Sequence, residues 1–445
     1  MARRREVATL WTGGRLSWFE QLCLKSFVDK GQKVTLFSYA DVPNVPEGVI
    51  RRDGREIVEA DALAADGTVV NDALFADWFR IRMLRNCSGT IWVDPDVYCH
   101  RPMGYDGDYV LGYETSEGDR VGVSVLGLPV HSPILADLAG FMSDPFAVPP
   151  YLKKSLIEAY EAAKIAGNPV HASRQPAGVW GAPMITHFAD RHRLKGKMQP
   201  ADAFYPVNLP ERRLFLQDPG KVEAMLTGRT TALPLWAANR REIALRHGGL
   251  PPKGSYLEML AARHGIPAEK AIIEERGGTA EDADLLDLLP EGSRIGTLAD
   301  LGGTAQPLAL AAHARDGCRI VLVDIDGRGA FAKTESAWVP RYLTALSAAG
   351  VPAHRVSVVR DAAELVPFDL VCNLSGFGDI HKVQRLGPFL SACFHPGSLM
   401  LMDIRKGSGS FPFLKPFGTC ETVSSRDDGG VPVSRVLFRP TPPDR

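Results

Sequence analysis

The chain has 445 residues, of which 45% are hydrophobic and 23% are charged, and its formal net charge is −1 at pH 7. This length predicts two or three domains, and the apolar fraction is sufficient for ordinary globular cores. A net charge close to zero excludes a chain-wide attraction to polyanions, and no motif for reading nucleic acid is present.

The seven cysteines are scattered along the chain without a Cys-x-x-Cys pair. This usage argues against a zinc site or a disulfide framework and indicates a reducing compartment. The basic start, Met1 to Arg5, is followed by an apolar stretch that is too short for a signal peptide, and no run reaches the roughly 20 apolar residues of a membrane span. We therefore expect a cytoplasmic protein with at most peripheral contact at the cytoplasmic face of a membrane.

The residue pattern of the first half of the chain predicts a helix and a strand in succession. A helix is predicted over residues 71–84, where apolar residues recur at helical spacing, and it ends near Gly89, which suits a left-handed C-cap. The apolar run Ile91 to Val93 then predicts a buried strand that leads into Asp94-Pro95-Asp96. Helix, glycine, strand and Asp-x-Asp form one continuous unit.

Asp94 and Asp96 occupy alternate positions of an extended chain, so their carboxylates point the same way. Hard cations such as Mg²⁺ and Mn²⁺ take oxygen ligands, often one or two carboxylates together with the phosphates of the substrate. The alternative is a solvated turn after a strand. Asp77 and Arg80 share a helix face, either as a surface ion pair or as a polar pair that faces a sugar nucleotide.

The segments Ala76 to Arg80 and Gly89 to Val97 resemble the sugar-binding Asp-x-Asp region of retaining GT-A glycosyltransferases. That group contains mannosyltransferases, galactosyltransferases and bacterial capsule and lipopolysaccharide transferases. The resemblance covers residues 1 to about 265, where Leu10 to Gly14 is similar to the family's first strand and its nucleotide-facing turn, and Val34 to Tyr39 to its second strand. It implies a metal-dependent hexosyltransferase in which Asp94 and Asp96 hold Mn²⁺ or Mg²⁺ and in which Asp94, Asp96 and Arg80 are the catalytic residues.

The same resemblance implies the surroundings of that site. Asp77, Arg80 and Asp94 would contact the sugar and the diphosphate, and Thr12, Gly13 and Tyr39 would flank the nucleoside. The acceptor side would be formed by Trp180, Gly181 and Pro183. The chain departs from the family at Pro234, where many members carry a metal-binding histidine. Either another group such as His247 replaces it, or phosphates and water complete the metal shell.

A linker is expected over residues 268–292, between a GT-A domain at 1–267 and a second domain at 293–445. In the second domain strands are predicted at 294–300, 319–324, 356–359, 369–373 and 398–403, with helices at 307–313 and 337–349. This alternation predicts a parallel, doubly wound sheet. The predicted fold class is therefore α/β, with a Rossmann-like nucleotide-sugar domain followed by a second Rossmann domain.

The first strand-to-helix turn of the second domain contains Asp300, Gly302 and Gly303, and Asp324 and Asp326 close the next strand. An acidic residue at that place typically binds a ribose. The arrangement resembles class I S-adenosylmethionine-dependent methyltransferases, which implies that these five residues bind S-adenosylmethionine. The glycine turn is incomplete, so the alternative is a fold that serves as a structural or docking module. Asp379 and His381, past a later strand end, are either an acid and base or part of a glycine-rich turn.

These observations predict a glycosyltransferase that moves a sugar from a nucleotide-sugar donor to a glycan or lipid-linked acceptor in surface polysaccharide synthesis. One alternative is a sugar methyltransferase with a glycan-binding N-terminal half. The other is a non-catalytic assembly protein.

Overall fold

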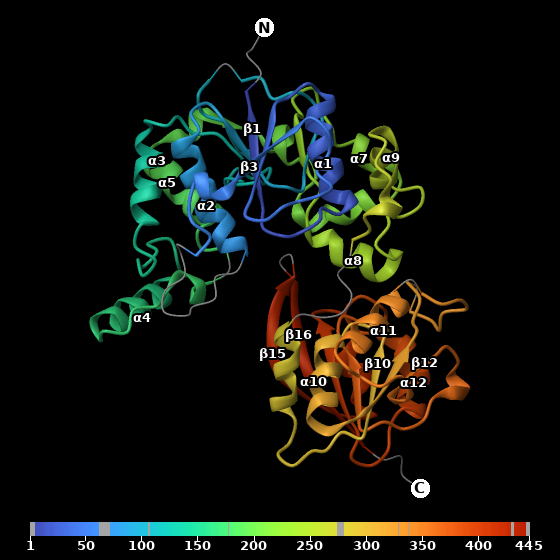
Figure 1. Ribbon diagram of the computed structural model, residues 1–445. Helices are drawn as coiled ribbons and strands as arrows, with labels where there is room; N and C mark the ends of the chain where they lie inside the picture. The colour runs from blue at the N-terminus through green and yellow to red at the C-terminus, as the bar shows by residue number, and fades with distance from the viewer. Residues whose placement is uncertain are drawn as a thin grey trace. The chain divides into compact units, whose positions relative to one another are not determined.

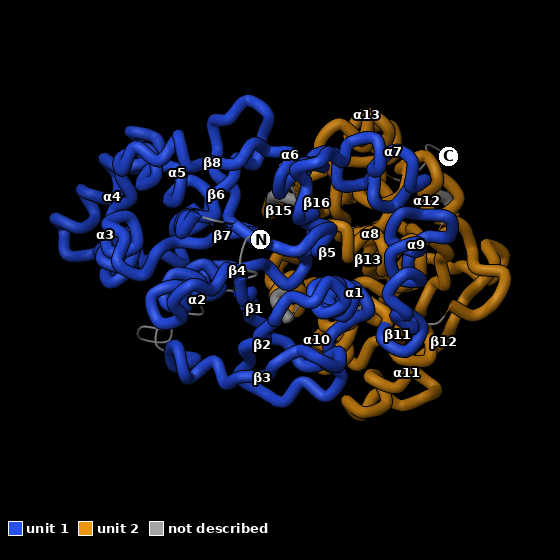
Figure 2. Tube along the Cα trace, turned by 90° about the horizontal axis from the view of Figure 1, so that it is seen from above, with its two compact units in different colours: residues 1–237, 251–271 blue, residues 238–250, 272–445 orange. Residues whose placement is uncertain are grey.

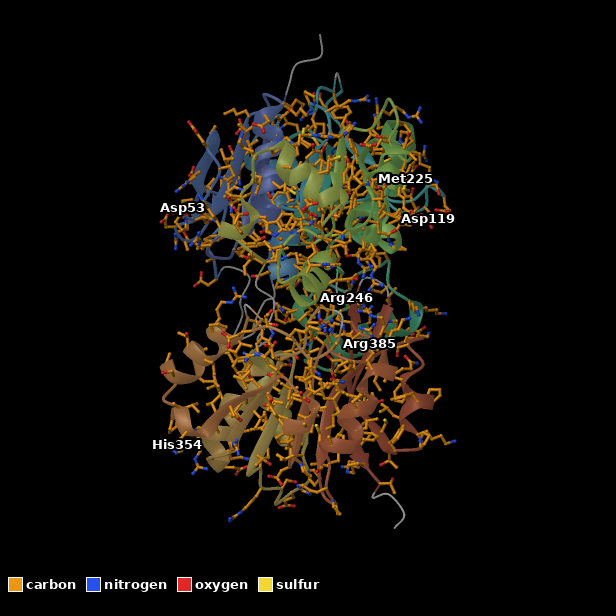
Figure 3. The ribbon with its side chains drawn as sticks, turned by 90° about the vertical axis from the view of Figure 1, so that its right-hand side faces the viewer. Asp53, Asp119, Met225, Arg246, His354 and Arg385 are labelled. Atoms are coloured by element: carbon orange, nitrogen blue, oxygen red, sulfur yellow. The ribbon has the colours of Figure 1, made fainter. Side chains whose placement is uncertain are left out.

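The computed structural model describes residues 5–61, 72–105, 107–176, 178–273, 280–327, 329–336, 338–428 and 431–441. The chain divides into two compact units, shown in Figure 1 and coloured separately in Figure 2. Unit 1 comprises residues 1–237 and 251–271, and unit 2 comprises residues 238–250 and 272–445. Figure 3 adds the side chains, with exposed residues such as Asp53 and Asp119 at the periphery of unit 1.

Unit 1 is built on a five-stranded sheet in the order β3-β2-β1-β4-β7. Its first four strands, in that order, are parallel, and only β7 runs antiparallel to its neighbour β4. The strands are β1 (Val7–Trp11), β2 (Val34–Ser38), β3 (Val49–Asp53), β4 (Ile91–Val93) and β7 (Val125–Leu126). Since β2 and β3 extend from one side of β1 and β4 lies on the other, the strand order reverses between β1 and β4, where open sheets bind ligands.

The two main helices of unit 1 cover opposite faces of this sheet. Along β1, Val7 packs with Leu24 and Phe27 of α1 (Trp18–Asp29), while Ala8 and Leu10 pack with α2 (Asp72–Asn86). This alternation follows from the two-residue period of a strand. Helix α1 begins at a capping box in which Ser17 and Glu20 satisfy each other's backbone N–H groups. The central strand β1 is therefore covered by a helix on each face.

The remaining regular elements of unit 1 lie outside the five-stranded sheet. Strands β5 (Val97–Cys99) and β9 (Ala232–Pro234) form one antiparallel pair, and β6 (Leu111–Gly112) and β8 (Met198–Gln199) form a parallel pair. The helices are α3 (Pro133–Phe141), α4 (Lys154–Ile165), α5 (Ala182–Arg191), α6 (Ala201–Phe204), α7 (Pro219–Glu223) and α9 (Tyr256–Arg263). The 3₁₀ helices are η1 (Gly54–Glu56), η2 (Ala172–Arg174), η3 (Leu194–Lys197), η4 (Leu209–Leu216) and η5 (Ala268–Lys270).

Unit 2 contains a seven-stranded sheet in the order β12-β11-β10-β13-β14-β16-β15. The first five of these strands are parallel, and β16 runs antiparallel to both β14 and β15. The strands are β10 (Thr297–Leu301), β11 (Arg319–Val323), β12 (Val356–Val359), β13 (Leu370–Asn373), β14 (Leu399–Arg405), β15 (Gly418–Asp428) and β16 (Val431–Pro440). Here the order reverses between β10 and β13.

Helices flank both faces of the unit 2 sheet, as a doubly wound fold requires. Leu298 of β10 faces a core with α10 (Gln306–Asp316) and α11 (Trp338–Ala348), while Ala299 and Leu301 face a core with α12 (Gly387–Ala392) and α13 (Ser410–Leu414). Unit 2 also contains α8 (Ala238–His247) and the 3₁₀ helices η6 (Ala280–Leu288), η7 (Ala353–Arg355), η8 (Ala362–Glu364) and η9 (Val383–Leu386).

Two segments depart from the expected domain organisation. The second part of the expected linker is folded, because Leu285, Leu286 and Leu289 lie in the core of unit 2. Residues 238–250, expected in the first domain, cluster with unit 2 and carry α8. The assignment of the two units to named enzyme domains remains a prediction.

The predicted α/β class with Rossmann-like parallel sheets is confirmed. The predicted helix at residues 71–84 corresponds to α2, and the five strands predicted in the second domain correspond to β10–β14. The sequence reading missed β3, β7 and the β15–β16 hairpin. Within the described ranges, none of the helices has both the length and the apolar character to cross a bilayer.

Candidate functional site

Two of the segments predicted to bind a nucleotide sugar lie at one edge of the unit 1 sheet. Thr12 and Gly13 follow β1, and Asp94 to Asp96 follow β4, the parallel neighbour of β1. The carboxyl ends of parallel neighbours meet at the same edge, and this is the place where the strand order reverses. Thr12 and Gly13 are exposed there.

Arg80 is buried between two carboxylates. Its Nη1 donates to Asp77 Oδ1 at 2.7 Å and its Nη2 donates to Asp94 Oδ1 at 2.8 Å, while only 4% of the residue is exposed. Asp77 and Arg80 are therefore not a solvated surface pair, and Asp94 does not sit in a fully solvated turn. We call Asp77, Arg80 and Asp94 the ion triad.

Trp92 supports the ion triad from within β4. Its Nε1 donates to Asp94 Oδ1 at 2.7 Å, and the Arg80 guanidinium carbon lies 5.1 Å from the centre of the Trp92 ring. The Arg80 cation gains from the face of the indole ring, and Asp94 is fixed in orientation by two donors. Trp92 was read from the sequence only as a buried strand residue.

Gly181 lies beside Asp77. A Cβ atom at Gly181, which immediately precedes α5, would lie 3.2 Å from Asp77 Oδ2. A side chain at this position would crowd that oxygen. Trp180 is buried and Pro183 is exposed in the first turn of α5, while Gly181 lies against the ion triad.

Burial sets the electrostatics of the ion triad. Burial raises the pKa of Asp77 to about 6, although Arg80 acts in the opposite direction and Asp94 adds to the rise. With two carboxylates and one guanidinium, the ionised ion triad has a negative charge in excess. Such a charge in a site with little water attracts cations and hydrogen-bond donors.

Asp96 has one satisfied and one unsatisfied oxygen. Its Oδ2 accepts the backbone N–H of Ala237 at 2.7 Å, whereas Oδ1 is buried and has no hydrogen-bond partner among the described residues. Burial, followed by the charge of Asp94, raises the pKa of Asp96 to about 7. A backbone donor such as Ala237 leaves no signature in the sequence.

A turn after β9 holds Ala237 against Asp96. Pro234 of β9 pairs with Val97 of β5, and the Leu235 N–H donates to the Asp96 carbonyl at 2.9 Å. Trp236, between them, has a left-handed φ of 61°, which is strained for a bulky residue. The stretch containing Pro234 therefore does reach the Asp-x-Asp segment, through its backbone.

The residues present fit a divalent cation in one respect. Asp96 Oδ1 is a buried anionic oxygen without a partner, and Asp94 Oδ1 already accepts two bonds, which leaves Asp94 Oδ2 for a cation. Within the part of the chain that the structure describes, no group of three or more His, Cys, Asp or Glu side chains forms a metal site. Two carboxylates suffice for Mg²⁺ when substrate phosphates supply other ligands. His247, considered as a third ligand, is the last residue of α8 in unit 2.

Tyr39, which is expected to flank the nucleoside, is half-buried and makes contacts within unit 1. Its hydroxyl donates to the Val58 carbonyl at 2.7 Å, and its ring makes edge contacts with Phe75 and Phe79 of α2. Gly54 lies so close that a Cβ there would be 2.7 Å from the Tyr39 ring. The structure thus gives Tyr39 a packing role.

In unit 2, Asp300 is fully engaged within the protein. Its Oδ1 accepts Thr304 N–H at 3.0 Å, and its Oδ2 accepts Ala305 N–H at 2.9 Å and the Tyr342 hydroxyl at 2.8 Å. These bonds shape the turn between β10 and α10. Burial nevertheless raises the pKa of Asp300.

Gly302 and Gly303 both have positive φ, 89° and 71°, as a tight turn at a strand end requires. A Cβ at Gly303 would lie 2.2 Å from the Trp338 ring, so α11 covers that glycine. Asp326 closes a short turn by accepting Ala330 N–H at 3.1 Å.

Asp324, at the end of β11, retains binding capacity. Its Oδ2 accepts Ser336 N–H at 3.0 Å and Arg360 Nε at 3.0 Å, but its buried Oδ1 has no hydrogen-bond partner in the described ranges. Arg360 directly follows β12, the parallel neighbour of β11, so the two strand ends bring it to Asp324; the sequence reading missed this residue.

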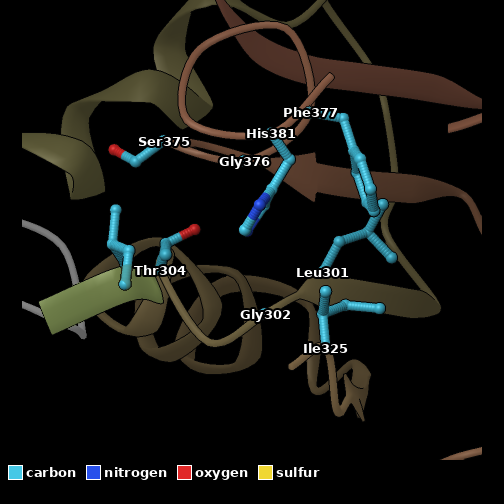
Figure 4. Close-up of a pocket in the computed structure, with 9 residues that line it drawn as sticks. Leu301, Gly302, Thr304, Ile325, Ser375, Gly376, Phe377 and His381 are labelled. Carbon is cyan, nitrogen blue, oxygen red and sulfur yellow. The ribbon is translucent and has the colours of Figure 1, made fainter. Parts of the chain in front are cut away.

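A small cavity lies at the carboxyl ends of β10 and β13, lined by residues that include Gly302, Thr304, Ser375 and His381. Figure 4 shows the His381 imidazole projecting from its loop into this space, on the side where Thr304 lies. The cavity leaves ≈ 10 Å³ for the centre of a water molecule. It therefore holds about one water.

Comparisons with known proteins show similarity in solved structures only, since no family model and no curated protein matches the chain. The PH0226 protein from Pyrococcus horikoshii OT3 is 13% identical over 36% of this chain and 89% of its own, with a TM-score of 0.27. The N-terminal domain of EvdMO1, solved in the presence of SAH and D-fucose, is 14% identical over 36% of this chain and 83% of its own, with a TM-score of 0.28.

The O-methyltransferase TomG from Streptomyces achromogenes, solved in complex with SAM, is 16% identical over 37% of this chain and 81% of its own, with a TM-score of 0.28. These matches cover little more than a third of the chain. At such identities and TM-scores they assign it no activity.

Proposed function

We propose that unit 1 is a metal-dependent retaining glycosyltransferase that transfers a sugar from a nucleotide-sugar donor to a glycan or lipid-linked acceptor. The observation that supports this proposal is the buried ion triad beside Asp96, at the strand ends where the order of the sheet reverses. A solvated surface would not hold an arginine that is 4% exposed between two carboxylates.

We assign each carboxylate of this arrangement to a part of the nucleotide-sugar donor. Asp77 Oδ2, left uncrowded by Gly181, would accept hydrogen bonds from sugar hydroxyls. Asp96 Oδ1 and Asp94 Oδ2 would hold Mn²⁺ or Mg²⁺, which when bound neutralises the charge that develops on the departing nucleoside diphosphate. Arg80 and Trp92 keep Asp94 oriented, so the cation would meet a preorganised carboxylate.

A nucleoside diphosphate is a good leaving group, so its departure needs no strong acid from the protein. Asp94 and Asp96 are therefore assigned to binding the cation. They are not assigned to the proton transfer and nucleophilic attack that the two carboxylates of glycoside hydrolases perform. The exposed Thr12 and Gly13 after β1 are assigned to the nucleoside side of the site.

A thermal-shift screen of nucleoside diphosphates with and without Mn²⁺ tests this function. At about 100 times Kd a ligand stabilises by about 2.7 kcal/mol, which raises Tm by roughly 5–10 °C for a domain of this size. We expect this rise with one nucleoside diphosphate and Mn²⁺ together, and its loss when EDTA is added. Equal Tm values for all nucleoside diphosphates would contradict the proposal.

We propose as a second candidate that unit 2 is a methyltransferase-like domain that binds S-adenosylmethionine. The specific observation in its favour is Asp324, whose buried Oδ1 faces no donor among the described residues. It closes the strand beside the Gly302–Gly303 turn. The hydroxyls of a ribose are the donors that such a carboxylate accepts.

Calorimetry with S-adenosylhomocysteine on the full chain tests this second candidate. Asp324→Asn is expected to weaken binding at least about 10-fold, because a hydrogen bond to a charged group is lost. Asp287→Asn, an exposed aspartate of η6, is the matched control and should bind like the unsubstituted protein. Equal affinity in the Asp324 variant would remove that residue from the ligand site.

A further inference from the structure

The cavity at the strand ends of unit 2 is far smaller than a nucleoside site. Small-molecule pockets usually enclose about 300–1,000 Å³, whereas this one holds about one water. Yet its walls have the features of a ligand site, with the positive-φ Gly302 at the end of β10 on one side and the His381 loop on the other (Figure 4).

Helix α8, which belongs to unit 2, forms one wall of the cavity. Leu245 lines the cavity, and the Arg246 carbonyl lies so close to Gly327 that a Cβ there would be 1.7 Å from it. Beyond the helix, Gly249 accepts the Ile273 N–H at 3.0 Å, which ties the end of the segment down. Residues 238–250 thus fill space in front of the strand ends.

Arg241 locks α8 in place. Its Nη2 lies 2.8 Å from Asp379 Oδ2 and 3.7 Å from Asp403 Oδ2, and it also donates to the Ser375 hydroxyl. Both aspartate side chains are fully buried. Charged hydrogen bonds of this kind are strong and directional.

The lock is separable from the fold of unit 2. Asp379 also binds Arg405, with Nε to Oδ1 at 3.0 Å, and Asp403 also binds Arg435, with Nε to Oδ1 at 2.9 Å. Loss of Arg241 therefore leaves neither aspartate unpaired. The helix itself is short and polar, Ala-Asn-Arg-Arg-Glu-Ile-Ala-Leu-Arg-His, and a ten-residue helix is marginal without its contacts.

We propose that α8 is a removable cover over the ligand site of unit 2, locked by Arg241, and that a nucleoside-sized ligand enters only when α8 moves away. The identity of that ligand as S-adenosylmethionine rests on the second candidate function; the cover itself does not. When the open form is the minor one, the apparent affinity of the ligand falls in proportion to the open fraction.

The test compares the full chain with Arg241→Ala and with Arg439→Ala, a control arginine that forms an exposed ion pair with Glu421. Hydrogen exchange of residues 238–250 and diethyl pyrocarbonate modification of His381 report on opening, and calorimetry with S-adenosylhomocysteine reports on binding. In the Arg241 variant we expect both opening signals to rise at least about 10-fold and binding to tighten at least about 10-fold. The control should match the unsubstituted protein.

The outcomes separate the two ideas. Unchanged exchange and unchanged His381 reactivity in Arg241→Ala would overturn the cover. Faster opening without binding of S-adenosylhomocysteine by any variant would support the cover and overturn the second candidate function. Equal affinity in all variants, with α8 still protected in the complex, would show that α8 does not block entry and would overturn the cover.

Discussion

Replacing Arg80 with alanine is expected to lower the free energy of unfolding of unit 1 by about 3–5 kcal/mol, the usual cost of removing one partner of a buried ion pair. Asp77 and Asp94 would both lose their cation, and Trp92 would lose the guanidinium over its ring. Urea denaturation followed by tryptophan fluorescence measures the change. The same variant should lose affinity for the nucleotide sugar, measured by calorimetry at a temperature where it is folded.

This loss of stability is expected to grow with pH. The pKa of Asp77 is about 6 in the folded chain, above about 3.9 for an ordinary aspartate, so its ionisation costs stability as pH rises through that window. Without Arg80, which lowers this pKa, the folded value rises further. The difference between variant and unsubstituted protein should therefore be larger at pH 8 than at pH 5.

Arg82 supplies the matched control on the same helix. It lies over the Trp78 ring, with its guanidinium carbon 5.2 Å from the ring centre, and it is only half-buried. Arg82→Ala should cost about 1 kcal/mol or less, as a partly exposed cation–π contact does. If Arg80→Ala proved equally mild, the ion triad would not be the buried centre of the site.

The fold was largely predictable because its strong signals are periodic and local. The apolar strands at Ile91 to Val93 and Arg319 to Val323 and the helical spacing of α2 show in the sequence, and the structure has them there. Strand β3 was missed because its residues, Val-Ile-Arg-Arg-Asp, are half-exposed on an edge and lack an apolar run. Edge strands carry the weakest hydrophobic signal.

The sequence indicated which side chains form the candidate site but not which backbone groups bind them. Asp77, Arg80, Asp94 and Asp96 stood out because residue type and spacing carry information. The donor that binds Asp96 is the backbone N–H of Ala237, 141 residues away in the chain, and any residue but proline supplies one. The nucleoside contact of Tyr39 stays a prediction, since a tyrosine at a strand end suits a binding site and a core equally well.

Helix α8 shows why domain boundaries were harder still. Its residues lie within the stretch, 1 to about 265, that resembles glycosyltransferases, so they were expected in the first domain. Their place in unit 2 depends on Arg241 meeting Asp379 and Asp403, more than 130 residues further along. Such long-range ion pairs have no local signature.

Replacing Asp96 with asparagine is expected to abolish transferase activity while leaving the metal-free protein as stable as before or more stable. Burial and the charge of Asp94 raise the pKa of Asp96 to about 7, so at pH 8 its charge is held in an unfavourable place. An asparagine keeps an oxygen for the Ala237 N–H and removes that charge. A buried charge that is kept for activity lowers the stability of the metal-free protein.

The expected loss of activity is at least about 10²-fold, because a neutral amide oxygen is a poor substitute for a carboxylate on a divalent cation. Release of nucleoside diphosphate from the donor in the presence of Mn²⁺ measures it, and urea denaturation in EDTA measures stability. Asp119→Asn, an exposed aspartate of unit 1 (Figure 3), is the matched control and should change neither. Full turnover in Asp96→Asn would contradict the metal assignment. An inactive variant that is also less stable would make Asp96 a structural residue. Only a functional carboxylate lowers stability in the metal-free protein and is required for activity when the metal is bound.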